Sequence, residues 1–139
     1  MTMPGASLAQ AAAELVGTPF RLHGASAEHG VDCVGLVACA LARIGREPHR
    51  PQGYGLRNSH IDHHLAFAAL NGLVQADGPL QSGDVMLVVP GPGQHHLLIA
   101  EDLSHFIHAH AGLRKVVRMP GPLPWPIEQH WRLGAANSR

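Results

Sequence analysis

The spacing of apolar residues changes character near Pro79, and this change constrains the fold more than any other feature of the chain. Before Pro79 the apolar residues recur at intervals of three and four, as they do along one face of a helix. After Pro79 come short apolar or β-branched runs separated by turn residues, at 85–89, 96–100, 105–109 and 113–119. Such runs are typical of an antiparallel meander. Helices followed by strands predict an α+β fold.

Two helices are expected before residue 46. The first covers about 8–16, with Ser7 at its start as part of a capping box. The second begins at Cys33, where Asp32 supplies the N-cap and Gly45 ends the helix. An apolar residue recurs at helical spacing throughout this second segment, so its limits are well defined.

The segment 46–59 is polar and rich in proline and glycine, which predicts an excursion over the surface. A third helix follows, with Ser59 as its cap and an end at Asn71. Its predicted apolar face consists of Ile61, Leu65, Ala68 and Ala69. The tail is a proline-rich crossing followed by residues 127–134, which are compatible with either a short helix or a strand.

Length and charge limit the classes of protein to consider. A chain of 139 residues suits one domain, 1–139, that buries roughly two thirds of its unfolded surface without a metal or a disulfide. Ten basic and ten acidic residues cancel, which argues against a nucleic-acid partner. Neither a signal peptide nor a membrane span is expected, so the protein is predicted to be made in the cytoplasm without membrane insertion.

The two cysteines occupy one predicted helix. Cys33 and Cys39 are six residues apart, which separates them by about 9 Å along the helix axis. This distance is too long for a disulfide. Both are therefore expected to be free thiols, with Cys39 packed in the core.

Cys33 stands at the start of its helix, where unpaired N–H groups and the helix dipole favour a thiolate. His96 and His108 lie on successive predicted strands, and a short hairpin between them would put both on the same face. In this arrangement Cys33 would act as the nucleophile, His96 as the general base and His108 as the group that orients His96. His95 is the competing base, but on a strand it would face away from His96. A buried cysteine and a strand histidine are also common as core residues.

A zinc site is the other interpretation of so many histidines. Against it, His105 and His108 would lie on opposite faces of one strand. The chain also has no His-Glu-x-x-His or paired Cys-x-x-Cys motif. No metal and no other cofactor is therefore expected at the candidate ligands, which are His105, His108, His110, Asp62, His63 and His64.

Five short motifs occur in a characteristic order. They are GTPF at 17–20, DCVGLV at 32–37, GDV at 83–85, HLLI at 96–99 and FIHA at 106–109. This order resembles the NlpC-type cell-wall cysteine peptidases, a papain-like family. The DCVGL form, together with Trp131 and Arg132, looks most like the branch encoded with phage tails and gene-transfer particles.

The resemblance implies a papain-like fold in which N-terminal helices carry Cys33 and an antiparallel meander carries His96 and His108. It also implies hydrolysis of an amide in peptidoglycan stem peptides, typically between γ-D-glutamate and diaminopimelate, through an acyl-enzyme on Cys33. The expected partners are the stem peptide and phage-tail-like proteins. Delivery to the cell wall is then expected through a phage-like particle or on lysis.

The chain departs from the family pattern at two positions. Phe20 stands where the family usually has a tyrosine, and His23 is the nearby candidate to replace its hydroxyl. Val34 stands where many members have a serine that helps to bind a free amino end of the substrate. The candidate substrate-binding residues are thus Phe20, His23, Asp32 and Val34. The departures also allow a degenerate structural tail component, and the same fold could serve an acyltransferase or amidase.

Overall fold

The computed structural model describes residues 4–49 and 62–134. The predicted cap Ser59, the predicted core residue Ile61 and most of the predicted surface segment lie outside this part of the chain. The helices are α1 (Pro4–Glu14), α2 (Cys33–Arg43) and α3 (Asp62–Leu70). The strands are β1 (Ala25–Ser26), β2 (Gly30–Val31), β3 (Leu73–Gln75), β4 (Val85–Val88), β5 (His96–Ala100), β6 (His105–His110), β7 (Lys115–Pro120) and β8 (Ile127–Leu133).

Six strands form one antiparallel sheet in the order β3-β8-β4-β5-β6-β7. The predicted meander of four strands is confirmed as β4 to β7. The tail, left open between helix and strand, is β8, which pairs with both β4 and β3. Trp131 and Leu133 of β8 are two residues apart and both buried, which is the period of a strand. The short strand β3 was not predicted.

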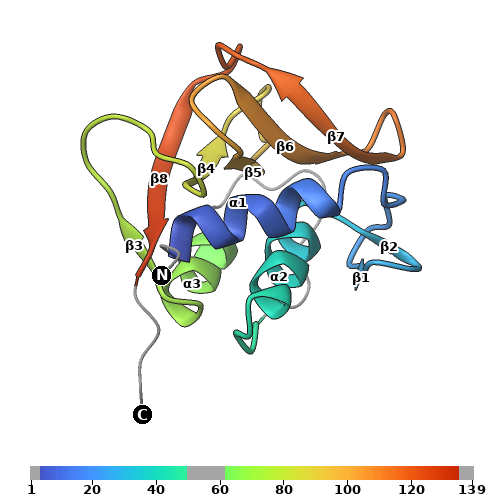
Figure 1. The fold of residues 1–139 in the computed structure, drawn as a ribbon. Coiled ribbons are helices and arrows are strands. Elements are labelled where there is room, and N and C mark those ends of the chain that lie inside the picture. The colour runs from blue at the N-terminus through green and yellow to red at the C-terminus, as the bar shows by residue number, and fades with distance from the viewer. Residues whose placement is uncertain (1–3, 50–61, 135–139) are drawn as a thin grey trace.

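The three helices cover one face of the sheet (Figure 1). The main core lies between the helices and the sheet, and it contains residues from every helix and from strands β3 to β8. A second apolar cluster lies on the other face, formed by Met86, Val88, Leu98, Ala100 and Phe106. Because β4 and β5 are buried on both faces, their sequences are continuous apolar runs rather than alternating ones.

Two expectations for the helices were wrong in detail. Helix α1 begins at Pro4, so Ser7 lies inside it and is not its cap. Proline is well tolerated in a first helical turn, where its missing N–H has no partner to lose. In α3 the buried residues are His64, Phe67 and Ala68, whereas Leu65 and Ala69 face outward. The predicted α+β class itself is confirmed. Among the described residues, no helix combines the length and the apolar character needed to cross a membrane.

Candidate active site

A cavity of about 440 Å³ opens beside the start of α2. Cys33, His96 and His108 all line it, so the fold brings together the three residues that the sequence singled out. Its walls also include Phe20, Leu22, Asp32, His64, Pro90, Gln94, His95, Ala109, His110, Ala111, Gly112 and Trp125.

Helix α2 delivers Cys33 to the cavity as its first residue. The Asp32 carboxylate caps the helix by accepting a hydrogen bond from the Gly35 N–H at 2.8 Å, as predicted. Its other oxygen accepts the His23 backbone N–H at 2.7 Å, which ties the preceding loop to the helix start. A Cβ on Gly35 would lie 1.7 Å from the Gly24 carbonyl oxygen, so that loop packs directly against the helix. The position of Cys33 is therefore fixed from both sides.

Strands β5 and β6 diverge where they approach Cys33. They pair at Ile99 with Ile107 and at Ala100 with Phe106, and the described ladder extends no further. Helix α2 packs against both strands. The Leu97 N–H, released from the ladder, donates a hydrogen bond to the Cys33 sulfur instead. The strand divergence thus makes room for the thiol at the edge of the sheet.

His96 and His108 form the predicted hydrogen-bonded pair. His96 Nε2 lies 2.9 Å from His108 Nδ1, and the two rings meet edge to face at 82°. Continuing the strand register places His96 across from His110, so the bond to His108 is diagonal rather than between direct cross-strand neighbours.

The hydrogen bond between the rings limits the tautomers that the two histidines can adopt together. His96 Nε2 is occupied by His108, so Nδ1 is the ring nitrogen of His96 that is left to accept a proton. A neutral His96 with Nδ1 free must carry its proton on Nε2 and donate it to His108 Nδ1. His108 then holds its own proton on Nε2, an atom that is buried without a partner among the described residues.

Trp125 covers this pair and was missed by sequence reasoning. Its ring lies 6.0 Å from that of His108 and 6.4 Å from that of His96, edge to face in both cases. Trp125 belongs to the proline-rich crossing before β8 and packs against the second apolar cluster. Only the folded path of that crossing brings it here, so local sequence patterns held no signal for it.

The protonation states differ from the expected thiolate. Burial, and then the charge of Asp32, raise the pKa of the Cys33 thiol to about 12, although backbone N–H groups at the sulfur act in the opposite direction. Burial also lowers the pKa of His96 to about 3 and that of His108 to about 4. The expectation that the helix start would lower the thiol pKa was wrong, because desolvation and a like-signed neighbour outweigh the backbone N–H groups at the sulfur. At neutral pH the thiol and both imidazoles are uncharged.

Comparison with known proteins locates this arrangement among solved folds. No family model and no curated protein matches the sequence. NlpC2 from Trichomonas vaginalis superposes with a TM-score of 0.67 at 17% identity, over 95% of this chain and 49% of that one. An NlpC/P60 family protein from Bacillus cereus ATCC 10987 gives 0.66 at 21% identity, over 95% and 41%. The NlpC/p60 domain of the peptidoglycan hydrolase SagA gives 0.58 at 21% identity, over 85% and 90%.

This chain has the NlpC/P60 fold. It spans less than half the length of the first two proteins and most of the third, which is a single domain. The predicted papain-like α+β architecture is therefore confirmed by both topology and superposition.

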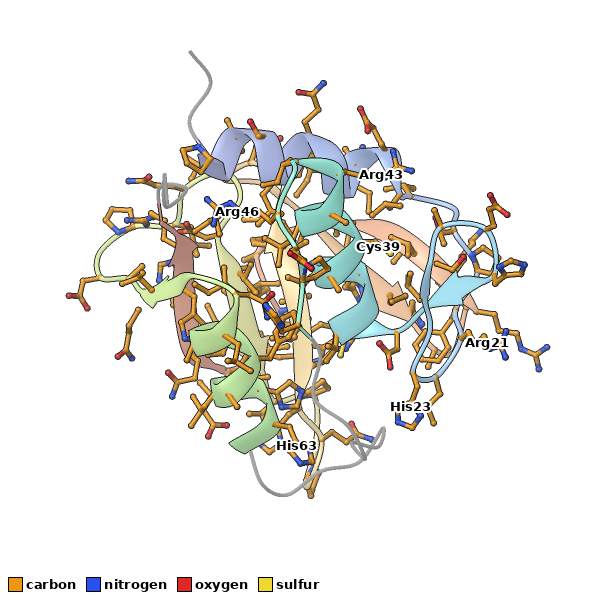
Figure 2. All side chains as sticks on the ribbon, turned by 90° about the horizontal axis from the view of Figure 1, so that it is seen from below. Arg21, His23, Cys39, Arg43, Arg46 and His63 are labelled. Carbon is orange, nitrogen blue, oxygen red and sulfur yellow. The ribbon has the colours of Figure 1, made fainter. Side chains whose placement is uncertain are left out.

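Within the NlpC/P60 fold, the four predicted substrate-binding residues separate into two groups. Phe20 and Asp32 line the cavity. Val34 is fully buried in the main core, and His23 is exposed on the loop before β1 (Figure 2). Neither Val34 nor His23 lines the cavity, so His23 is not placed to replace a tyrosine hydroxyl there. The residue after Cys33 turns into the core because α2 buries that side against the sheet.

The histidines around the cavity also differ from expectation. His95 lines the cavity together with His96, because it precedes β5 and does not obey strand alternation. It pairs with Glu128 at 3.2 Å. His64 of α3 is buried, and burial lowers its pKa to about 4. Among the described residues, no three histidine, cysteine or acidic side chains converge in a way that would hold a metal ion. Neither Cys33 nor Cys39 forms a disulfide, and Cys39 lies further along α2 (Figure 2).

Proposed function

We propose that the protein is a cysteine peptidase that hydrolyses an amide in peptidoglycan stem peptides, of the γ-D-glutamyl-diaminopimelate type. The observation that carries the proposal is the meeting of Cys33 with the hydrogen-bonded pair His96 and His108 in one cavity. The motif order and the likeness to a domain named as a peptidoglycan hydrolase support the choice of substrate.

The proposed reaction follows from the neutral groups in the cavity. His96 Nδ1 takes the thiol proton as the Cys33 sulfur attacks the amide carbonyl, so proton transfer and bond formation occur together. The tetrahedral intermediate then expels the amine, which leaves with the proton from His96. The resulting thioester on Cys33 is hydrolysed by a water that His96 activates. His108 accepts the Nε2–H of His96 throughout and keeps Nδ1 directed toward the sulfur.

The test is digestion of purified peptidoglycan followed by mass spectrometry of the released fragments. Wild type is expected to release stem-peptide fragments, and Cys33→Ala is expected to release none. Cys39→Ala is the matched control, since it removes the other cysteine of the same helix, which is also outside any disulfide. Identical fragments from wild type and Cys33→Ala would refute the proposal.

The raised pKa of Cys33 favours one alternative, a structural component of a phage-like tail in which the thiol is inert. Alkylation by iodoacetamide near pH 7 distinguishes the two. If His96 acts as a base, His96→Ala slows alkylation of Cys33 and leaves alkylation of Cys39 unchanged. An inert thiol would react equally slowly with and without His96.

A further inference from the structure

His110 lies next to the proposed catalytic pair and has no part in the mechanism described above. It is the last residue of β6, two positions beyond His108 and therefore on the same face of the strand. Its ring centre is 5.5 Å from that of His108, and it lines the same cavity. The strand register also places it across from His96.

The turn after β6 fixes the orientation of the His110 ring. His110 Nδ1 accepts a hydrogen bond from the Leu113 N–H at 3.0 Å. Gly112 packs against the ring, since a Cβ there would lie 3.1 Å from Cε1 of His110. A neutral His110 with Nδ1 as acceptor must carry its proton on Nε2.

The Nε2–H of His110 is the donor that remains for a ligand. Among the described residues, the structure gives this atom no hydrogen-bond partner. It is also not among the polar atoms that are buried without a partner. An oriented donor that solvent can reach, on a half-buried ring at the wall of the cavity, suits recognition of an oxygen acceptor.

We propose that His110 is a substrate-binding residue that donates its Nε2–H to a carbonyl or carboxylate oxygen of the peptide beside the scissile amide. The inference rests on the proposed peptidase function and assigns a residue to substrate selection. It also gives the turn 111–114 a role, because that turn sets which nitrogen of His110 carries the proton.

Two substitutions separate binding from turn structure. In His110→Asn the amide oxygen takes the place of Nδ1, so the hydrogen bond from Leu113 is kept and the cavity donor is lost. In His110→Gln the amide nitrogen takes the place of Nε2, so the cavity donor is kept and the bond from Leu113 is lost. The proposal predicts that His110→Asn weakens substrate binding and that His110→Gln does not. A purely structural role predicts the reverse order.

Binding is measured in the Cys33→Ala background, where no cleavage occurs, by titration with a soluble γ-D-glutamyl-diaminopimelate stem peptide. His110→Asn is expected to raise Kd on the order of tenfold, the value of one hydrogen bond. His110→Gln is expected to stay within about threefold of the parent. Melting curves of both variants show whether each is folded.

The outcomes separate this inference from the proposed function. Equal Kd values for His110→Asn and the parent, equal weakening by both substitutions, or no binding of the peptide by the parent would each overturn the role of His110. Binding that depends on His110 as predicted, together with no cleavage by wild type, would refute the peptidase and leave the binding residue standing.

Discussion

Replacing His108 isolates the role of the hydrogen bond between the two histidines. In His108→Ala the His96 Nε2–H loses its acceptor at 2.9 Å, and His96 is free to turn or to change tautomer. In His108→Asn the amide oxygen can stand where Nδ1 of the imidazole stood. The two variants therefore remove the same ring but differ in whether an acceptor remains for His96.

The structure sets the size of the expected effect. A buried donor left without its partner costs about 1–3 kcal/mol. If this cost falls on the catalytic geometry, kcat/KM of His108→Ala falls roughly 5- to 150-fold, at about 1.4 kcal/mol per factor of ten. His108→Asn is expected to stay within about fivefold of wild type, since the hydrogen bond is re-formed at a neutral acceptor. It also removes the unpartnered Nε2 of His108.

The assay is the initial rate of cleavage of a soluble stem peptide, with melting temperatures to show that each variant is folded. His108→Gln is the matched control, because its amide reaches the former Nε2 position and leaves His96 without an acceptor. It should resemble His108→Ala. The reasoning is refuted if folded His108→Ala keeps the wild-type rate, or if His108→Asn is as slow as His108→Ala.

Three further predictions concern packing, a buried carboxylate and the resting thiol. Gly35→Ala places a Cβ 1.7 Å from a backbone carbonyl oxygen. Denaturant titration should therefore show a loss of about 1–3 kcal/mol in the free energy of unfolding. An unchanged unfolding midpoint would contradict this prediction. Burial alone would raise the pKa of Asp84, but hydrogen bonds, chiefly from Arg132, lower it. Asp84→Asn should therefore lower the free energy of unfolding by about 1.5–3 kcal/mol at neutral pH. Because the folded pKa is the lower one, wild-type stability should fall as pH drops below about 4, and Asp84→Asn should show less of this fall in melting temperature. Because Cys33 and His96 are both neutral, kcat/KM should be independent of pH from about pH 5 to pH 9. A bell-shaped pH profile that rises and falls within this range would instead indicate a thiolate–imidazolium pair.

Local signals predicted the fold best where several of them coincided. Helix α2 runs from Cys33 to Arg43 as expected, because the Asp32 cap, the apolar period and the glycine at 45 with a φ of 87° all agree. Helix α3 is apolar on nearly every side, so its period could not decide which face is buried. Packing against the core chose Phe67 instead of Leu65. Segment β8 is a strand because it pairs with β3 and β4. These partners are distant in sequence, so the local pattern could not decide between helix and strand.

The candidate site shows the same division between local and tertiary causes. The motif order placed Cys33, His96 and His108 correctly in one cavity, since each belongs to an element whose type was evident. The position of Trp125 at the site could not be predicted, because a proline-rich crossing has no apolar period from which its path could be inferred. The direction of the Cys33 pKa shift could not be predicted from the sequence either. The helix dipole acts locally and is visible in the sequence, but desolvation depends on the whole fold.

The divergence of β5 from β6 accounts for the main features of the site together. Had the ladder continued past Ile99, the Leu97 N–H would bond to β6 and could not donate to the Cys33 sulfur. The Leu97 side chain packs in the main core, whereas the ring of the preceding residue, His96, is directed toward His108. A thiol surrounded in this way is desolvated, which is why its pKa is high. Under the proposed function, a neutral His96 rather than the helix start is then the group that activates Cys33.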